Sequence, residues 1–156
     1  MQSIIYSIIL NPIFVISVLS SIISQFFKMV LYSIKKKKLI LDVIWKGYGN
    51  KAGMPSSHTA FVSGACATIF LMEGGPSNLF MLSLITAIVT VQTVVDLKFH
   101  FDSASDYIND MFDLIVDTKE NAWKKFEHLT GHTYNQVIIG AIIGVYTALT
   151  LYPNLI

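Results

Sequence analysis

The chain contains no arginine, and all 11 of its basic residues are lysine. Arginine is the side chain that most often clamps a phosphate through two parallel hydrogen bonds. Any anion that this protein binds must therefore be held by lysine, backbone N–H groups or hydroxyls. Charged residues of both signs make up only 13% of the sequence, and the net charge of +1 predicts no nucleic-acid partner.

A disulfide framework is also excluded, because Cys66 is the single cysteine and lies in an apolar run. No cleaved signal peptide is expected, since the first lysine is Lys28 and no basic residue precedes the apolar start. Hydrophobic residues form 53% of the 156 positions. Several apolar runs approach or exceed the roughly 20 residues that a helix needs to cross a bilayer. The composition predicts an all-α, polytopic integral membrane helical bundle.

The apolar runs predict about four transmembrane helices in a single membrane domain, residues 1–156. The first begins at Asn11-Pro12, because Asn caps helices well and Pro fits the first helical position. Residues 1–10 would form an interfacial arm. The last span carries Gly140 and Gly144 in a GxxxG spacing, which suits packing within the chain or a homodimer. The predicted spans are about 12–34, 57–71, 79–95 and 133–152.

The lysines predict the orientation of these spans. Six lie in residues 35–51 and four in 96–132, whereas the 73–78 turn has none. Lysine-rich loops stay in the cytoplasm. We therefore expect cytoplasmic segments at 35–55 and 96–132, with both chain termini on the other side.

Acidic residues recur every three or four positions in the second segment, which places them on one stripe of a helix. An apolar stripe lies opposite, so we expect an amphipathic cytoplasmic helix. A divalent metal site is the less favoured alternative, and we expect no metal and no cofactor. The acidic stripe comprises Asp102, Asp106, Asp110, Asp113, Asp117 and Glu120.

Two histidines stand at the starts of predicted spans. His58 follows Pro55-Ser56-Ser57, and His132 precedes Thr133, so each lies beside a residue type that caps helices. Helix N-termini present unpaired N–H groups that bind phosphate. The predicted topology puts both histidines on the cytoplasmic side. They are candidates for an acid/base or nucleophile pair at one site.

The first predicted span contributes polar residues on one face. Gln25, Lys28 and Lys35 follow at helical spacing towards its cytoplasmic end. A lysine inside a span usually lines a polar cavity or reaches to the interface. Gln92 and Asp96 share a face at the inner end of the third span. These residues are expected to surround the two histidines.

The pair Met54-Pro-Ser-Ser-His58 and Leu129-Thr-Gly-His-Thr133 resembles the type 2 phosphatidic acid phosphatase superfamily. The closer resemblance is to its short divergent branch, related by name to acid phosphatases and vanadium-dependent haloperoxidases, and it covers most of the chain. It implies a phosphohistidine mechanism in which His132 attacks phosphorus and His58 protonates the leaving oxygen. Lys28, Lys35, Lys51, Ser56 and Ser57 would bind the substrate phosphate.

The chain departs from the superfamily pattern in charged residues. The acid that the superfamily places four residues after the nucleophile is Gln136 here, and the expected arginine is Phe126. Gln136 and Gln25 would then orient neighbouring groups. Our hypothesis is that Asp96 takes over the role of the missing acid, with Lys98 or Lys51 supplying positive charge.

The resemblance thus implies a phosphoric monoester hydrolase acting on a phospholipid phosphate, with phosphatidylglycerophosphate as the suggested lipid. The alternative is a catalytically degenerate protein of the same fold that binds lipid head groups or supports a complex. A small transporter has little support, because only four spans are expected and the sequence has no sign of an inverted repeat.

Overall fold

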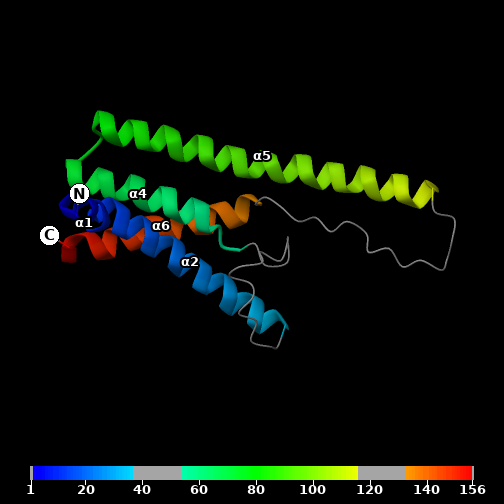
Figure 1. Ribbon diagram of the computed structural model, residues 1–156, viewed down its shortest axis with the longest axis horizontal. Helices are drawn as coiled ribbons and strands as arrows, with labels where there is room; N and C mark the ends of the chain where they lie inside the picture. Colours follow the sequence, from blue (N-terminus) through cyan, green and yellow to red (C-terminus); the bar gives the residue numbers. More distant parts are fainter. Residues whose placement is uncertain (1, 37–53, 116–132, 156) are drawn as a thin grey trace.

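The computed structural model describes residues 2–36, 54–115 and 133–155, and in these ranges the chain is helical with no strand. The predicted all-α membrane bundle is confirmed (Figure 1). The helices are α1 (Gln2–Ile9), α2 (Pro12–Lys36), α4 (Ser57–Glu73), α5 (Asn78–Ile115) and α6 (Tyr134–Leu155).

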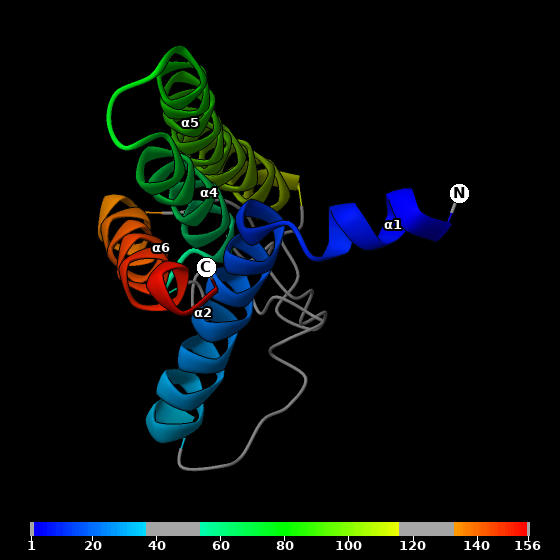
Figure 2. The ribbon, with the colours of Figure 1, turned by 90° about the vertical axis from the view of Figure 1, so that its left-hand side faces the viewer.

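The break between α1 and α2 lies at the predicted position. The Asn11 side chain accepts a hydrogen bond from the N–H of Ile13 at 2.9 Å, and Pro12 is the first residue of α2. Asn11 is therefore the N-cap, and Pro at the next position loses no helical hydrogen bond. Figure 2 shows α1 projecting sideways from the bundle, which fits the expected interfacial arm.

The centre of the bundle is formed by α2, α4 and α6, which pack against one another. Small residues allow this close approach. A Cβ atom on Gly64 would lie 2.6 Å from the Oγ atom of Ser20, so α2 and α4 nearly touch there. Ser20 is fully buried, and its hydroxyl is satisfied by the carbonyl of Ile16 at 2.7 Å.

The glycine pair of α6 packs against α4 within the same chain. A Cβ atom on Gly144 would lie 2.7 Å from the backbone nitrogen of Gly64, and one on Gly140 would collide with the carbonyl oxygen of Ser56. Both glycines are buried. The contact is the intramolecular use of the GxxxG spacing, and a homodimer through the same face would have to displace α4.

Helix α5 differs from the sequence-based expectation. It continues without interruption from Asn78 to Ile115, so the first part of the acidic stripe extends the third predicted span instead of forming a separate helix. The reason is the absence of glycine and proline between these residues, which leaves nothing to end the helix. At 1.5 Å per residue its 38 residues span about 57 Å, well beyond a hydrocarbon core of about 30 Å.

Three described helices are long and apolar enough to cross a membrane: Pro12–Ile34, Asn78–Phe112 and Tyr134–Leu155. The last runs past the predicted end at Tyr152 and keeps Pro153 inside its final turn, where the missing N–H of proline removes one helical hydrogen bond. Helix α4 has 17 residues, about 26 Å, and ends at Gly74 in a left-handed conformation with φ of 68°. It packs against α2, α5 and α6, and its status as the fourth span stays a prediction.

Candidate functional site at the N-termini of α4 and α6

The N-termini of α4 and α6 are joined directly at one end of the bundle. The backbone N–H of Ser56 donates to the carbonyl oxygen of Gln136 at 3.0 Å. The side chain of Gln25 on α2 donates to the hydroxyl of Ser57 at 3.2 Å. Three segments that are far apart in the sequence therefore meet where both helices begin (Figure 1).

Ser56 is the N-cap of α4. Its hydroxyl oxygen accepts from the N–H of Thr59 at 3.3 Å and from the Thr59 hydroxyl at 3.0 Å. Ser56 is completely buried and Ser57 nearly so. The geometry assigns capping to Ser56, and the phosphate contacts expected of both serines stay predictions.

Gln136 closes the first turn of α6. Its side-chain oxygen accepts from the N–H of Thr133 at 2.8 Å. Thr133 directly precedes the helix, so this contact is the half of a capping box in which the third helical residue reaches back to the N-cap. The side chain is 7% exposed. Its oxygen is thus engaged by the backbone at the position where the superfamily has a carboxylate.

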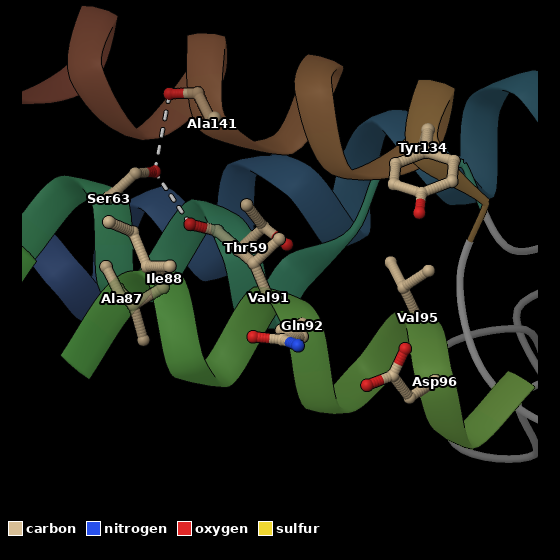
Figure 3. Close-up of a pocket in the computed structure, with 11 residues that line it drawn as sticks. Thr59, Ser63, Ala87, Ile88, Val91, Gln92, Val95, Asp96, Tyr134 and Ala141 are labelled. Atoms are coloured by element: carbon tan, nitrogen blue, oxygen red, sulfur yellow. Dashed lines mark hydrogen bonds between the residues drawn. The ribbon is translucent and has the colours of Figure 1, made fainter. Parts of the chain in front are cut away.

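A cavity of about 340 Å³ opens beside these N-termini, between α4, α5 and α6. Figure 3 shows its polar end, where Tyr134 at the start of α6 faces the stretch of α5 that carries Val95 and Asp96. Gln92 and Thr59 also line it. Asp96, predicted to belong to the site, therefore lies in a cavity beside the α6 N-terminus.

The structure describes some of the other predicted site residues and not others. His58 lies exposed in the first turn of α4, and Lys28 is partly buried on α2. Lys35 is in the last turn of α2. Lys51 and His132 lie outside the described residues, so the proximity of the two histidines stays a prediction.

No metal centre is found within the described ranges, where no group of three or more His, Cys, Asp or Glu residues could hold an ion. Asp102, Asp106 and Asp110 follow one another along α5 at helical spacing. Spacing along one straight helix spreads carboxylates over about 12 Å, too far to share one cation.

Two residues that the sequence analysis did not single out belong to this region. Thr59 bonds the cap of α4 and lines the cavity, and Tyr134 lines its mouth. The sequence did contain a signal for Thr59. It stands three residues after Ser56, and the backbone N–H at that position commonly donates to the side chain of the N-cap residue. Tyr134 could not be selected, because its role depends on the approach of α5.

The fold and this arrangement define a class: an integral membrane protein of packed helices in which two helix N-termini meet beside a largely apolar cavity with a few polar groups at one end. Comparison of the sequence identifies the particular family. The chain belongs to the divergent PAP2 family, whose model matches residues 9–147. The predicted resemblance is thereby confirmed.

The chain is also similar to a bacterial relative. It is 27% identical over 146 residues to the uncharacterized membrane protein YuiD of Bacillus subtilis (strain 168). The match covers 86% of this chain and 90% of the relative. No solved structure matches the chain.

Proposed function

We propose that this protein is a membrane phosphatase that removes the phosphate from a phospholipid at the lysine-rich, cytoplasmic side of its membrane. Phosphatidylglycerophosphate is the first substrate to test. The supporting observation is the backbone hydrogen bond between Ser56 and Gln136, which joins the starts of α4 and α6. His58 follows Ser56 by two residues, and His132 precedes Gln136 by four.

The proposed reaction has two phosphoryl-transfer steps. A ring nitrogen of His132 attacks phosphorus and forms a phosphorus–nitrogen bond, while the bond to the lipid oxygen breaks and His58 protonates that oxygen. A water molecule then attacks the phosphohistidine, which releases inorganic phosphate and the free histidine. The N–H groups at both helix starts, with Lys28, Lys35 and Lys51, would stabilise the negative charge on the phosphoryl oxygens.

The hypothesis for Asp96 follows from the engagement of Gln136. A neutral amide whose oxygen already accepts from Thr133 cannot stabilise an imidazolium by charge. Asp96 lines the cavity next to the α6 N-terminus and is the one carboxylate among the described residues of that lining. We assign to Asp96 the task of holding His132 in one tautomer, with Lys98 or Lys51 supplying positive charge.

The test is phosphate release by the purified full-length protein from phosphatidylglycerophosphate and phosphatidate in mixed micelles. His132→Ala and His58→Ala should each abolish release, and Asp96→Asn should lower it at least tenfold. The matched control is His100→Ala, which removes an exposed histidine on α5 and should leave the rate unchanged.

Two outcomes would contradict the proposal. Unchanged turnover in Asp96→Asn would remove the role of that carboxylate. An absence of release by the wild-type protein from either lipid would favour the alternative of a catalytically degenerate protein that binds lipid head groups or acts as a scaffold. The uncharged capping role of Gln136 is the observation in favour of that alternative.

A further inference from the structure

A second cavity adjoins the one at the site. The second cavity, about 360 Å³, lies further along the same three helices and shares Ser63 and Ala87 with the first. The two adjoining cavities together are here called the α5–α6 groove. Helix α4 forms its floor and α5 and α6 its walls, because α5 packs against α4 and leaves the space beside α6 unfilled.

The α5–α6 groove is polar at one end and apolar over the rest. Gln92, Asp96 and Tyr134 line the end at the α4 and α6 N-termini (Figure 3). Phe80 and Leu149 line the opposite end, where the exposed lining is apolar. The polarity therefore changes along the groove in one direction, starting at the candidate site.

The dimensions suit a single hydrocarbon chain. Along α6 the lining runs from Tyr134 to Leu149, 15 residues or roughly 22 Å. One leaflet of a bilayer core is about 15 Å deep. Small side chains in the lining leave the groove open, among them Ala67, Ala87 and Ala141.

The charge at the polar end indicates which part of an amphiphile lies there. Among the described lining residues there is a carboxylate, an amide and hydroxyls but no cation. The amide and the hydroxyls can hydrogen-bond hydroxyl and ester groups, whereas the carboxylate of Asp96 would repel a phosphate. The phosphate itself would have to lie beyond the groove, at the helix N-termini and the lysines.

We propose that the α5–α6 groove binds one acyl chain of a glycerophospholipid, entering sideways from the membrane, with the glycerol region at Gln92, Asp96 and Tyr134. This inference rests on the proposed function and narrows it, since the substrate is then a long-chain lipid phosphate and not a water-soluble phosphate ester. Binding of the acyl chain would fix how deep in the membrane the phosphate lies relative to the helix N-termini. The remote part of the substrate would thereby position the group that reacts.

Ala87→Phe tests the groove, because position 87 lines both cavities. The matched control is Val89→Phe, on the same helix at a side chain that is 57% exposed and lines neither cavity. With long-chain phosphatidate, Ala87→Phe should raise KM at least fivefold, whereas hydrolysis of a water-soluble aryl phosphate should stay at the wild-type rate. Val89→Phe should change neither. Equal loss on both substrates, or no loss on either, would overturn the inference.

A second measurement does not need catalysis. The wild-type protein in vesicles is irradiated with a phosphatidate that carries a photoreactive group in its acyl chain, and the labelled peptides are identified by mass spectrometry. We expect saturable labelling of α5 and α6 around Leu84 and Val145, competed by unlabelled phosphatidate and reduced in Ala87→Phe. Such labelling without phosphate release would retain the groove and reject the enzyme. Uniform, unsaturable labelling of all exposed faces, or a crosslink to a second protein chain, would reject the groove.

Discussion

Gln136 has a structural role at a position where the superfamily pattern has an acidic residue. Its oxygen satisfies the N–H of Thr133, one of the unpaired donors at the start of α6, and its own carbonyl oxygen accepts from Ser56 on the neighbouring segment. The residue thus stabilises the α6 N-terminus and ties it to α4. The side-chain oxygen makes the first contact and the backbone carbonyl the second, so only the cap on Thr133 depends on the side chain at position 136.

A prediction for Gln136 follows from this cap. Gln136→Leu removes the acceptor and leaves the N–H of Thr133 unpaired, which should cost about 1 kcal/mol. For a chain of this size the loss corresponds to a fall of about 2–4 °C in Tm, measured by thermal unfolding in detergent. Gln136→Glu is the matched variant, because glutamate is the usual acceptor of a capping box and should keep the wild-type Tm. Equal Tm values for Leu and Gln would contradict the assignment.

At the scale of the elements, the closest contact is that of α6 on α4. Gly140 and Gly144 lie directly on the α4 backbone, near Ser56 and Gly64 respectively. Without a hydrophobic driving force between helices in lipid, such close packing is the main source of association. The same contact brings the two helix N-termini together, so the packing of small residues and the geometry of the site depend on each other.

Gly144→Ala should therefore destabilise the bundle, by about 1–3 kcal/mol, because the added methyl group meets backbone atoms that cannot move aside. Ile142→Phe is the control, since it adds atoms on the same helix at a side chain that is 61% exposed. Thermal unfolding in detergent measures the loss, and light scattering on the same samples reports the oligomeric state. A shift from dimer to monomer in Gly144→Ala, with unchanged Tm, would instead favour the homodimer.

At the scale of the whole molecule, the two ends of the bundle are chemically different. The N-termini of α4 and α6 and the polar end of the α5–α6 groove lie at one end, and the Gly74 turn, where α4 leads to α5, lies at the other. Lysines are concentrated in the segments that the sequence assigns to the first end. The rule that lysine-rich loops stay in the cytoplasm predicts that this first end faces the cytoplasm.

Cysteine labelling tests this orientation. In a Cys66→Ala background, Lys46→Cys and Pro76→Cys should react with a membrane-impermeant maleimide from opposite sides, Lys46→Cys from the cytoplasmic side. Sealed right-side-out and inverted vesicles supply the two accessible faces. The buried Cys66 of the wild-type protein serves as the unreactive control. The four-span topology places one span, residues 57–71, between these two positions. Labelling of both positions from the same side would therefore contradict it.

The sequence by itself determined the class of protein and the starts of most helices. Continuous apolar runs of this length favour helices in lipid, because a helix satisfies its backbone groups within its own segment. Local chemistry fixes the ends in the same way: Asn11-Pro12 begins α2, and Ser56 begins α4, whatever the rest of the chain does. The motif that carries the family resemblance is likewise a local run of residues.

Only the tertiary structure decided which residues meet. The direct bond from Ser56 to Gln136 and the lining of the groove by Tyr134 depend on the distance and angle between helices. The distance and angle arise from the fit of small side chains across an interface, as with Gly144 against α4. The local sequence around each of these residues does not specify which residue of another helix it contacts.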